Sequence, residues 1–248
     1  MSEIKVLGGS TEKEKSNRNF IVDQLKHTPI PDQELIFNLG LYMNRQSLSR
    51  LLFMTELYRK IIDVHGVIME FGVRWGQNLA LFSSLRGMLE PYNYNRKIIG
   101  FDTFQGFPSV DEKDGDKVSK GDYSVSSGYK EILEGILAYH ESESPIPHKR
   151  KFELIQGDAT VTIYEYLKKN PETIVSFAYF DFDIDMPTKV CLEAILPRLT
   201  KGSIIAFDEL NCPEFPGETL AAMEVLGLSK YAIKRSTLNP LISYLIIE

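Results

Sequence analysis

Short apolar segments alternate with segments of helical character from Val67 onward, and this alternation constrains the fold more than any other feature. The apolar segments span 67–71, 97–101, 152–155, 175–180 and 203–207, and their length and composition predict buried strands. Helices are predicted between and after them, over 76–89, 129–140, 162–169, 188–199 and 218–226. Strands that alternate with helices form βαβ units, so we predict an α/β fold with a mostly parallel sheet.

The two ends of the chain depart from this pattern. Segments 231–235 and 241–247 predict a closing antiparallel strand pair, which completes a seven-stranded sheet. Residues 33–62 carry apolar side chains at helical spacing and predict one or two helices that cap the sheet. We therefore expect a polar N-terminal arm (1–31) and one domain (32–248), of which residues 32–65 form a helical cap.

Composition excludes several classes of protein. With 43% hydrophobic and 25% charged residues, the 248-residue chain has ordinary globular usage. No apolar run reaches the roughly 18–20 residues that span a bilayer, and the start lacks the apolar core of a signal peptide. A net charge of -6 disfavours nucleic acid as a partner. Two cysteines, Cys191 and Cys212, are too few for a disulfide framework or a four-cysteine zinc site, so we expect the reducing cytoplasm.

Sheets of this kind bind ligands beyond the carboxyl ends of their strands, so we examine those ends for functional residues. The first strand runs into EFGVRWG (70–76), whose two glycines permit a tight turn and the close approach of a ligand. The third glycine of the dinucleotide motif G-x-G-x-x-G is missing. Glu70 would repel a pyrophosphate and suits a cation such as S-adenosylmethionine, although an ordinary strand–helix turn with a solvated Glu70 is an equal alternative.

Two further strand ends carry one acidic residue each. Asp102 follows the glycine turn at about the spacing at which a carboxylate binds the ribose of a cofactor, which NAD and S-adenosylmethionine both contain. The third strand runs into QGDA (156–159), where Asp158 could bind an adenine amino group. Either aspartate could instead cap a turn or a helix.

Carboxylates are concentrated at the ends of the fourth and fifth strands, in DFDID (181–185) and in Asp208-Glu209. Adjacent strands would bring these side chains together, and they would repel each other unless a cation lay between them. Oxygen ligands suit magnesium or calcium, which could bind two oxygens of a diol and lower the pKa of one hydroxyl. A nearby carboxylate could then act as general base. Solvated loop acids are the alternative, most credibly for Asp185.

Together these strand ends resemble the macrocin O-methyltransferase family, class I S-adenosylmethionine-dependent enzymes that act on deoxysugars. The resemblance covers about residues 41–228 and rests on MEFGVRWG (69–76), FDTFQGFP (101–108), FDFD (180–183) with Thr188-Lys189, and AFDE (206–209). The versions FDEL (207–210) and PGE (216–218) are most similar to the branch from calicheamicin-type sugar biosynthesis.

The resemblance implies a Rossmann-like fold and methyl transfer to a hydroxyl of a nucleotide-linked or glycan-linked sugar, assisted by a divalent cation such as magnesium. The 103–128 loop would close over the site. The implied catalytic residues are Asp183, as candidate base, and Asp181, and the implied metal ligands are Asp181, Asp208 and Glu209. The implied cofactor-binding residues are Glu70, Gly72, Arg74, Trp75, Gly76, Asp102, Thr103, Phe104, Gly157, Asp158, Ala159 and Asp181.

The sequence departs from the family at two places. Family members often have Asp-Leu-Tyr-Glu where this chain has DIDM (183–186), in a segment that would face the acceptor, so the acceptor stays open. Glu209 replaces a commoner aspartate.

Three other functions stay open. An NAD-dependent sugar oxidoreductase shares the fold class, but Glu70 and the incomplete glycine motif disfavour it. The remaining two are a methyltransferase of another small molecule and a non-catalytic binding protein, which would need no carboxylate cluster. The apolar helices before Gly66 could pair two copies of the chain or cover one edge of their own sheet.

Overall fold

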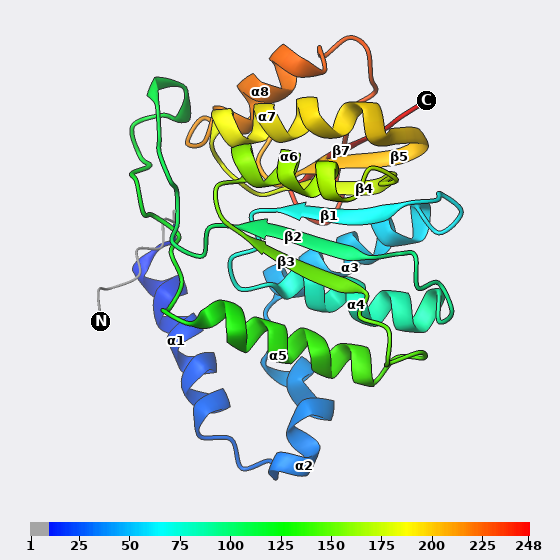
Figure 1. Cartoon of the computed structure of the whole chain (residues 1–248). Coiled ribbons are helices and arrows are strands. Elements are labelled where there is room, and N and C mark those ends of the chain that lie inside the picture. The colour runs from blue at the N-terminus through cyan, green and yellow to red at the C-terminus, as the bar shows by residue number, and fades with distance from the viewer. Residues whose placement is uncertain (1–9) are drawn as a thin grey trace.

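Seven strands form one sheet in the computed structural model of the protein, which describes residues 10–248 (Figure 1). The sheet order is β3-β2-β1-β4-β5-β7-β6. The parallel strands are β1 (Val67–Phe71), β2 (Ile98–Asp102), β3 (Phe152–Gln156), β4 (Val175–Phe180) and β5 (Leu199–Phe207). β7 (Ser243–Ile246) pairs antiparallel with both β5 and β6 (Lys234–Arg235). The predicted mostly parallel sheet with an antiparallel last pair is confirmed.

Two layers of helices cover the sheet (Figure 1). One face carries α3 (Arg45–Lys60), α4 (Gln77–Leu89) and α5 (Tyr129–Ser142), and the other carries α6 (Ala159–Lys169), α7 (Asp185–Ile195) and α8 (Gly217–Val225). Every residue of β1 and of β4 is buried, and each face of the sheet has its own hydrophobic cluster. A strand buried on both faces is continuously apolar, which is why these segments are recognisable in the sequence.

A row of stacked phenylalanine rings fixes the register of four strands at their carboxyl ends. Phe71 stacks on Phe101 at 5.1 Å and on Phe180 at 4.7 Å between ring centroids, and Phe180 stacks on Phe207 at 5.4 Å. The same residues are register partners in the sheet. The chain therefore leaves β1, β2, β4 and β5 at one edge, where side chains from distant parts of the sequence meet.

Two helices begin at other residues than predicted. α6 begins at Ala159 rather than 162, because the Asp158 side chain caps it and accepts a hydrogen bond from the Thr160 N–H at 2.9 Å. α7 begins at Asp185 rather than 188 and includes Pro187 in its first turn. A proline is tolerated there because first-turn N–H groups have no partner inside the helix. Short 3-10 turns, η2 (Glu112–Asp114) and η3 (Leu196–Arg198), complete the loops.

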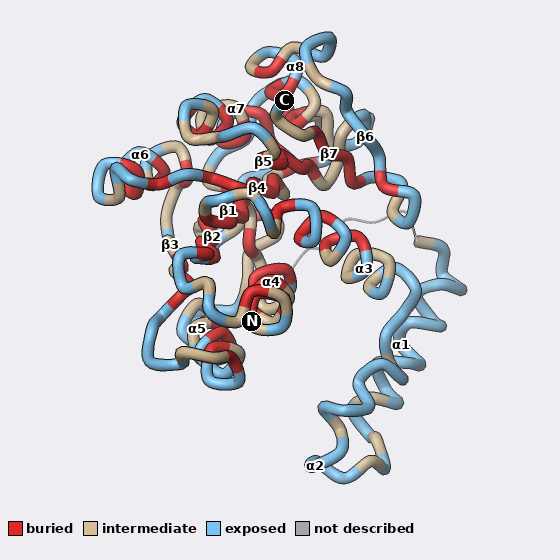
Figure 2. The backbone as a smooth tube through the Cα atoms, turned by 90° about the vertical axis from the view of Figure 1, so that its right-hand side faces the viewer, coloured by how far each residue is buried: buried red, intermediate tan, exposed pale blue. Residues whose placement is uncertain are grey.

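An N-terminal extension of α1 (Glu12–Lys26), α2 (Asp32–Leu35) and η1 (Ile36–Tyr42) stands away from the sheet and buries no residue (Figure 2). α1 begins at a capping box between Thr11 and Glu14. Residues 1–9 of the predicted arm lie outside the described residues, and the predicted division into arm and domain stays a prediction. Within residues 10–248, no helix has the length and apolar character needed to cross a membrane.

Candidate active site

The strand ends line a cavity of about 470 Å³. Every predicted site residue except Phe104 lines it: Glu70, Gly72, Arg74, Trp75, Gly76, Asp102, Thr103, Gly157, Asp158, Ala159, Asp181, Asp183, Asp208 and Glu209. Phe104 is buried in the core cluster on the α3–α5 face, and its place beside an adenosine stays a prediction. The topology thus brings together residues from five separate loops.

Gly72 and Asp102 hold the first loop in place. Gly72 has φ +91°, and a Cβ there would lie 2.0 Å from the carbonyl oxygen of Asp181, so only glycine fits. The Asp102 carboxylate accepts hydrogen bonds from the N–H groups of Val73 and Arg74, both at 2.7 Å, and from that of Phe104 at 2.5 Å. Burial raises the pKa of Asp102, and these backbone hydrogen bonds act in the opposite direction.

Glu70 presents an unpartnered carboxylate oxygen. Its side chain is buried, and Oε1 accepts a hydrogen bond from Asn78 Nδ2 at 2.8 Å, whereas Oε2 has no hydrogen-bond partner in the described protein. Burial raises the pKa of Glu70 well above its ordinary value, and Asp181 adds to this shift. A cationic donor that entered the cavity would satisfy Oε2 and favour the charged carboxylate.

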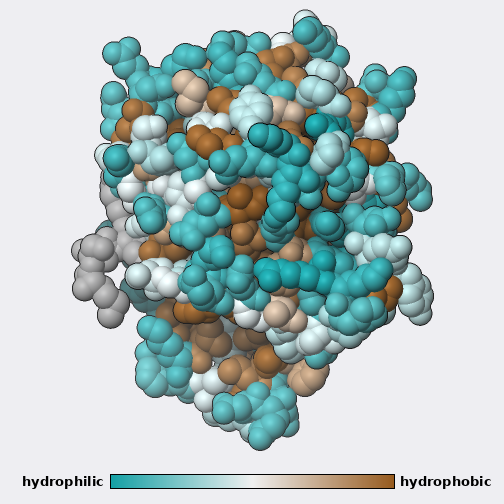
Figure 3. All heavy atoms as spheres, in the orientation of Figure 1, coloured by the Kyte–Doolittle hydropathy of each residue, from teal (hydrophilic) through white to brown (hydrophobic). Residues whose placement is uncertain are grey.

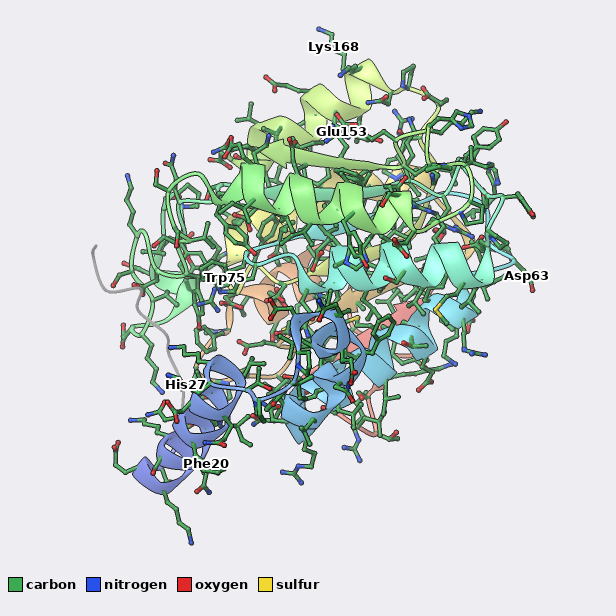
Figure 4. The ribbon with its side chains drawn as sticks, turned by 90° about the horizontal axis from the view of Figure 1, so that it is seen from below. Phe20, His27, Asp63, Trp75, Glu153 and Lys168 are labelled. Carbon is green, nitrogen blue, oxygen red and sulfur yellow. The ribbon has the colours of Figure 1, made fainter. Side chains whose placement is uncertain are left out.

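Two aromatic residues, Trp75 and Tyr123, contribute to one wall of the cavity. The Trp75 ring is 40% exposed and meets Tyr129 edge-on at 4.8 Å, and the Tyr129 hydroxyl donates to the Trp75 carbonyl at 3.0 Å. Figure 4 places Trp75 and α1 on the same side of the molecule, with Asp63 on the opposite side. The Arg74 guanidinium lies 4.7 Å from the centroid of the Tyr123 ring. This wall can receive a flat, weakly polar group.

Arg50, which sequence reasoning missed, lies between two of the predicted metal ligands. Its Nη1 is 3.3 Å from Asp181 Oδ2, and its Nη2 donates to Asp208 Oδ1 and, at 3.1 Å, to the Tyr179 hydroxyl. That hydroxyl donates to Asp208 Oδ1 at 2.6 Å. Arg50 lies on α3, 131 residues before Asp181, so no local sequence pattern could have paired them.

The Arg50 guanidinium lies where the sequence predicted a metal ion. The guanidinium already supplies the positive charge between Asp181 and Asp208, and the described residues contain no group of three or more His, Cys, Asp or Glu that could hold a metal ion. A magnesium ion bound by Asp181, Asp208 and Glu209 stays a prediction, and its binding would require Arg50 to move.

Three acidic side chains of this wall, those of Asp181, Asp183 and Glu209, have raised pKa values. Burial raises the pKa of Asp181 and of Glu209 to about 7, and Asp208 adds to both shifts. Burial also raises the pKa of Asp183 well above its ordinary value, and repulsion from Asp181 and Glu218 adds to this. Groups poised in this way can take up or release a proton at physiological pH.

The 103–128 loop covers the acidic wall. Phe107 and Val118 pack with Ile184 in a small apolar cluster. Asp114 Oδ1 accepts a hydrogen bond from the N–H of Asp185 at 2.7 Å. The Asp185 side chain is buried and pairs with Lys113 at 3.3 Å, so it is not a solvated loop acid. The loop that the sequence predicted to close over the site is thus anchored to it.

Comparisons with known proteins come from solved structures, because no protein-family model and no curated protein sequence matches the chain. The calicheamicin methyltransferase CalS11 is 42% identical, with a TM-score of 0.93 over 99% of this chain and 97% of that one. An apo structure of CalS11, described as a TDP-rhamnose 3′-O-methyltransferase, is 41% identical, with a TM-score of 0.86 over 97% and 96%. The O-methyltransferase NovP, at 16% identity, TM-score 0.60 and coverage of 81% and 80%, shares the fold alone.

Proposed function

Because the chain belongs to the same family of calicheamicin-type sugar O-methyltransferases as CalS11, we propose that it transfers a methyl group from S-adenosylmethionine to a sugar hydroxyl. The observation that carries this proposal is the identity of 42% over nearly the whole length of both chains. The cavity supports it, because one half is suited to a cationic nucleoside and the other to deprotonation of an alcohol. TDP-rhamnose is the first acceptor to test, since CalS11 is named for it.

The cofactor occupies the half of the cavity formed by β1, β2 and β3. Glu70 Oε2, which is buried and unpartnered, would accept a hydrogen bond from the ammonium group. Asp102 and Thr103 bind the ribose, and Asp158 and Ala159 border the adenine. Gly72 and Gly76 allow the close approach of the cofactor, Arg74 and Trp75 shape the outer wall, and Gly157 lines the adenine end. The place of Phe104 in the core favours a structural role for that residue.

The acceptor occupies the half formed by β4 and β5, and Asp183 removes its hydroxyl proton. Burial raises the pKa of Asp183 well above its ordinary value, which favours the protonated form when no cation lies beside it. S-Adenosylmethionine supplies an electrophilic methyl group on a positively charged sulfur, and a positive charge nearby lowers the pKa of a carboxyl group. The sulfonium charge therefore favours the carboxylate form of Asp183. This carboxylate accepts the hydroxyl proton as the acceptor oxygen bonds to the methyl carbon and the carbon–sulfur bond breaks, with the electron pair left on sulfur.

Asp181 helps to orient the acceptor and the cofactor relative to each other. Its carboxylate lines the cavity, and Arg50 Nη1 lies 3.3 Å from Asp181 Oδ2. The 103–128 loop excludes water, which matters because water competes with the acceptor for the methyl group. Residues of this chain fill all of these roles, and the predicted magnesium ion has none of them.

Calorimetry tests the cofactor. We expect S-adenosylhomocysteine to bind tightly and NAD to bind weakly or not at all. Glu70→Gln would weaken S-adenosylhomocysteine binding by about tenfold, because it removes a charged hydrogen-bond acceptor from the ammonium site. Tight binding of NAD without binding of S-adenosylhomocysteine would instead support the sugar oxidoreductase.

A homo-oligomer formed through the N-terminal extension completes the proposal. The extension exposes large apolar side chains, among them Phe37 at 87%, Leu41 at 68% and Phe20 at 61%. Figure 3 shows apolar atoms gathered at the lower end of the molecule, below α5. An apolar surface of this kind on a segment without a core of its own favours a second copy as its partner.

A cytoplasmic location also belongs to the proposal. Cys191 and Cys212 are free cysteines, which a reducing compartment preserves. Cell fractionation would test this, and recovery of the protein outside the cytoplasm would contradict it.

A further inference from the structure

Glu218 is a fully buried carboxylate that contacts both acidic loops of the site. It lies in the first turn of α8, outside the lining of the cavity. Its Oε1 accepts hydrogen bonds from the N–H of Phe182 at 2.9 Å and from that of Asp183 at 3.3 Å. Its Oε2 accepts a hydrogen bond from the N–H of Glu209 at 3.3 Å. One side chain therefore joins the loop after β4 to the loop after β5.

The preceding residue brings α8 against the same backbone. A Cβ on Gly217 would lie 2.5 Å from the Asp185 nitrogen and 2.8 Å from the Asp183 carbonyl oxygen, so a larger residue would force the helix away. Pro216, Gly217 and Glu218 form a segment of the family resemblance to which the sequence alone assigns no role. Its geometry supplies one.

Asp183 needs such support because its backbone is strained. Its φ is +63°, a conformation that residues other than glycine adopt rarely and that persists only where the surroundings hold it. The bond from the Asp183 N–H to Glu218 is one restraint, and the bond from the Asp185 N–H to Asp114 is another. Both act on the turn that aims the Asp183 side chain.

A carboxylate at position 218 is unfavourable by its charge but favourable by its hydrogen bonds. Glu218 is buried near Asp181 and Asp208, where a further negative charge is unfavourable. A glutamine would fill the same volume without that cost, but its NH₂ group cannot accept a hydrogen bond from a backbone N–H. Only a carboxylate offers acceptors to the N–H groups of both loops at once.

We propose that Glu218 is a positioning residue that holds the turn of Asp183, the proposed base, against the loop after β5, so that Asp183 is aimed for removal of the acceptor proton. The inference rests on the proposed function, because it assigns the positioned residue to that reaction. Glu218 acts through the two loops, and it touches neither the acceptor nor the cofactor.

The physical link is tested without an acceptor, by amide hydrogen exchange of the full chain. Glu218→Gln keeps the volume of the side chain but can join only one loop, and Glu218→Ala joins neither. We expect faster exchange in peptides that cover 181–185 and 208–211, with no change in those covering β4 and β5. Glu165→Gln, at an exposed position of α6, is the matched control and should change none of them. Unchanged exchange at both loops, or a uniform rise along the chain, would overturn the inference.

The consequence for catalysis is tested with S-adenosylmethionine and TDP-rhamnose. For Glu218→Gln we expect kcat to fall by about tenfold or more, because small displacements of a reacting group are costly. The affinity for S-adenosylhomocysteine should stay within about threefold of wild type, since the cofactor half is untouched. The pH dependence of kcat should shift by roughly half a unit or more, which loss of stability alone would not cause.

The outcomes separate the two proposals. A wild-type protein that does not bind S-adenosylhomocysteine refutes the proposed function, whereas the hydrogen-exchange result judges the link made by Glu218. A Glu218→Gln variant with wild-type kcat and wild-type pH dependence refutes the positioning role while the proposed function stands.

Discussion

Asp183 is placed for catalysis, and its placement lowers the stability of the folded protein. It is 8% exposed, has a strained backbone, and lies among like charges that burial keeps from being screened. A carboxyl group whose pKa is raised in the folded state favours folding less as pH increases between its unfolded and its folded pKa, because the folded protein must give up a proton that it binds more tightly. The residue that we assign to proton transfer should therefore destabilise the ligand-free enzyme above neutral pH.

Asp183→Asn tests this trade-off. We expect the variant to lose turnover and to gain stability on the order of 1 kcal/mol at pH 8. The gain should be smaller at pH 5, because the raised pKa of wild-type Asp183 favours its protonated form as pH falls. Thermal unfolding of both proteins in buffer with a chelator, at the two pH values, measures it. A variant that is active, or that is no more stable than wild type at pH 8, would contradict the assignment.

Arg50 decides how the carboxylate pair is neutralised. Arg50→Met removes the guanidinium from Asp181 and Asp208 and should cost roughly 2 kcal/mol of stability, because two partly buried charges lose their partner. Binding of magnesium ion, measured by calorimetry, should become tighter than in wild type, since the guanidinium and the ion compete for the same oxygens. Arg45→Met, at an exposed position of the same helix, is the control. Equal magnesium affinity in Arg50→Met and wild type would show that they do not compete.

Among the helices and strands, the residues at the strand ends could be predicted from the sequence, whereas side-chain partners from distant parts of the chain could not. Each of the five parallel strands contains a local apolar run, and the parallel topology then places Glu70, Asp102, Asp181 and Asp208 at one edge. Arg50 lies on a helix whose sequence shows no chemical motif. Phe104 follows Asp102 closely, yet its left-handed backbone (φ +57°) accompanies a side chain buried in the core. Local sequence predicts which loops meet, and packing decides which side chain of a loop enters the cavity.

Gly72→Ala tests the close approach of two strand ends. The added methyl would meet the Asp181 carbonyl oxygen, and the positive φ adds backbone strain, so we expect a loss of several kcal/mol and much weaker binding of S-adenosylhomocysteine. Gly135→Ala on α5 is the matched control, because nothing lies within 4 Å of its added methyl. That variant should be slightly more stable than wild type. A Gly72→Ala variant that unfolds and binds like wild type would refute the close contact between these two loops.

The whole molecule consists of a body, which has the α/β fold described above, and an N-terminal extension, which has no core of its own. The body of the protein buries its apolar residues on the two faces of the sheet, whereas the N-terminal extension leaves them exposed (Figure 2). The sequence indicated polar character over residues 1–31 and helices after residue 32, but periodicity cannot tell whether an apolar helix face meets its own sheet or another chain.

Association in solution should depend on the extension. We expect analytical ultracentrifugation to give a mass above the 28.3 kDa of one chain, and Phe37→Ser with Leu41→Ser to lower it without weakening S-adenosylhomocysteine binding. Met88→Ser, at a residue of α4 that is 73% exposed, should leave the mass unchanged. A monomeric wild-type protein would refute the proposed interface.

Sugar O-methylation is tested by following the methyl group from the cofactor to the acceptor. Purified protein is incubated with TDP-rhamnose and S-adenosylmethionine that carries an isotopically labelled methyl group, and the sugar is analysed by mass spectrometry and NMR. We predict one labelled methyl group on a sugar oxygen, formed together with an equal amount of S-adenosylhomocysteine and lost in Asp183→Asn. Binding of S-adenosylhomocysteine without transfer of label to TDP-rhamnose or to any other nucleotide-linked or glycan-linked sugar would contradict the claim.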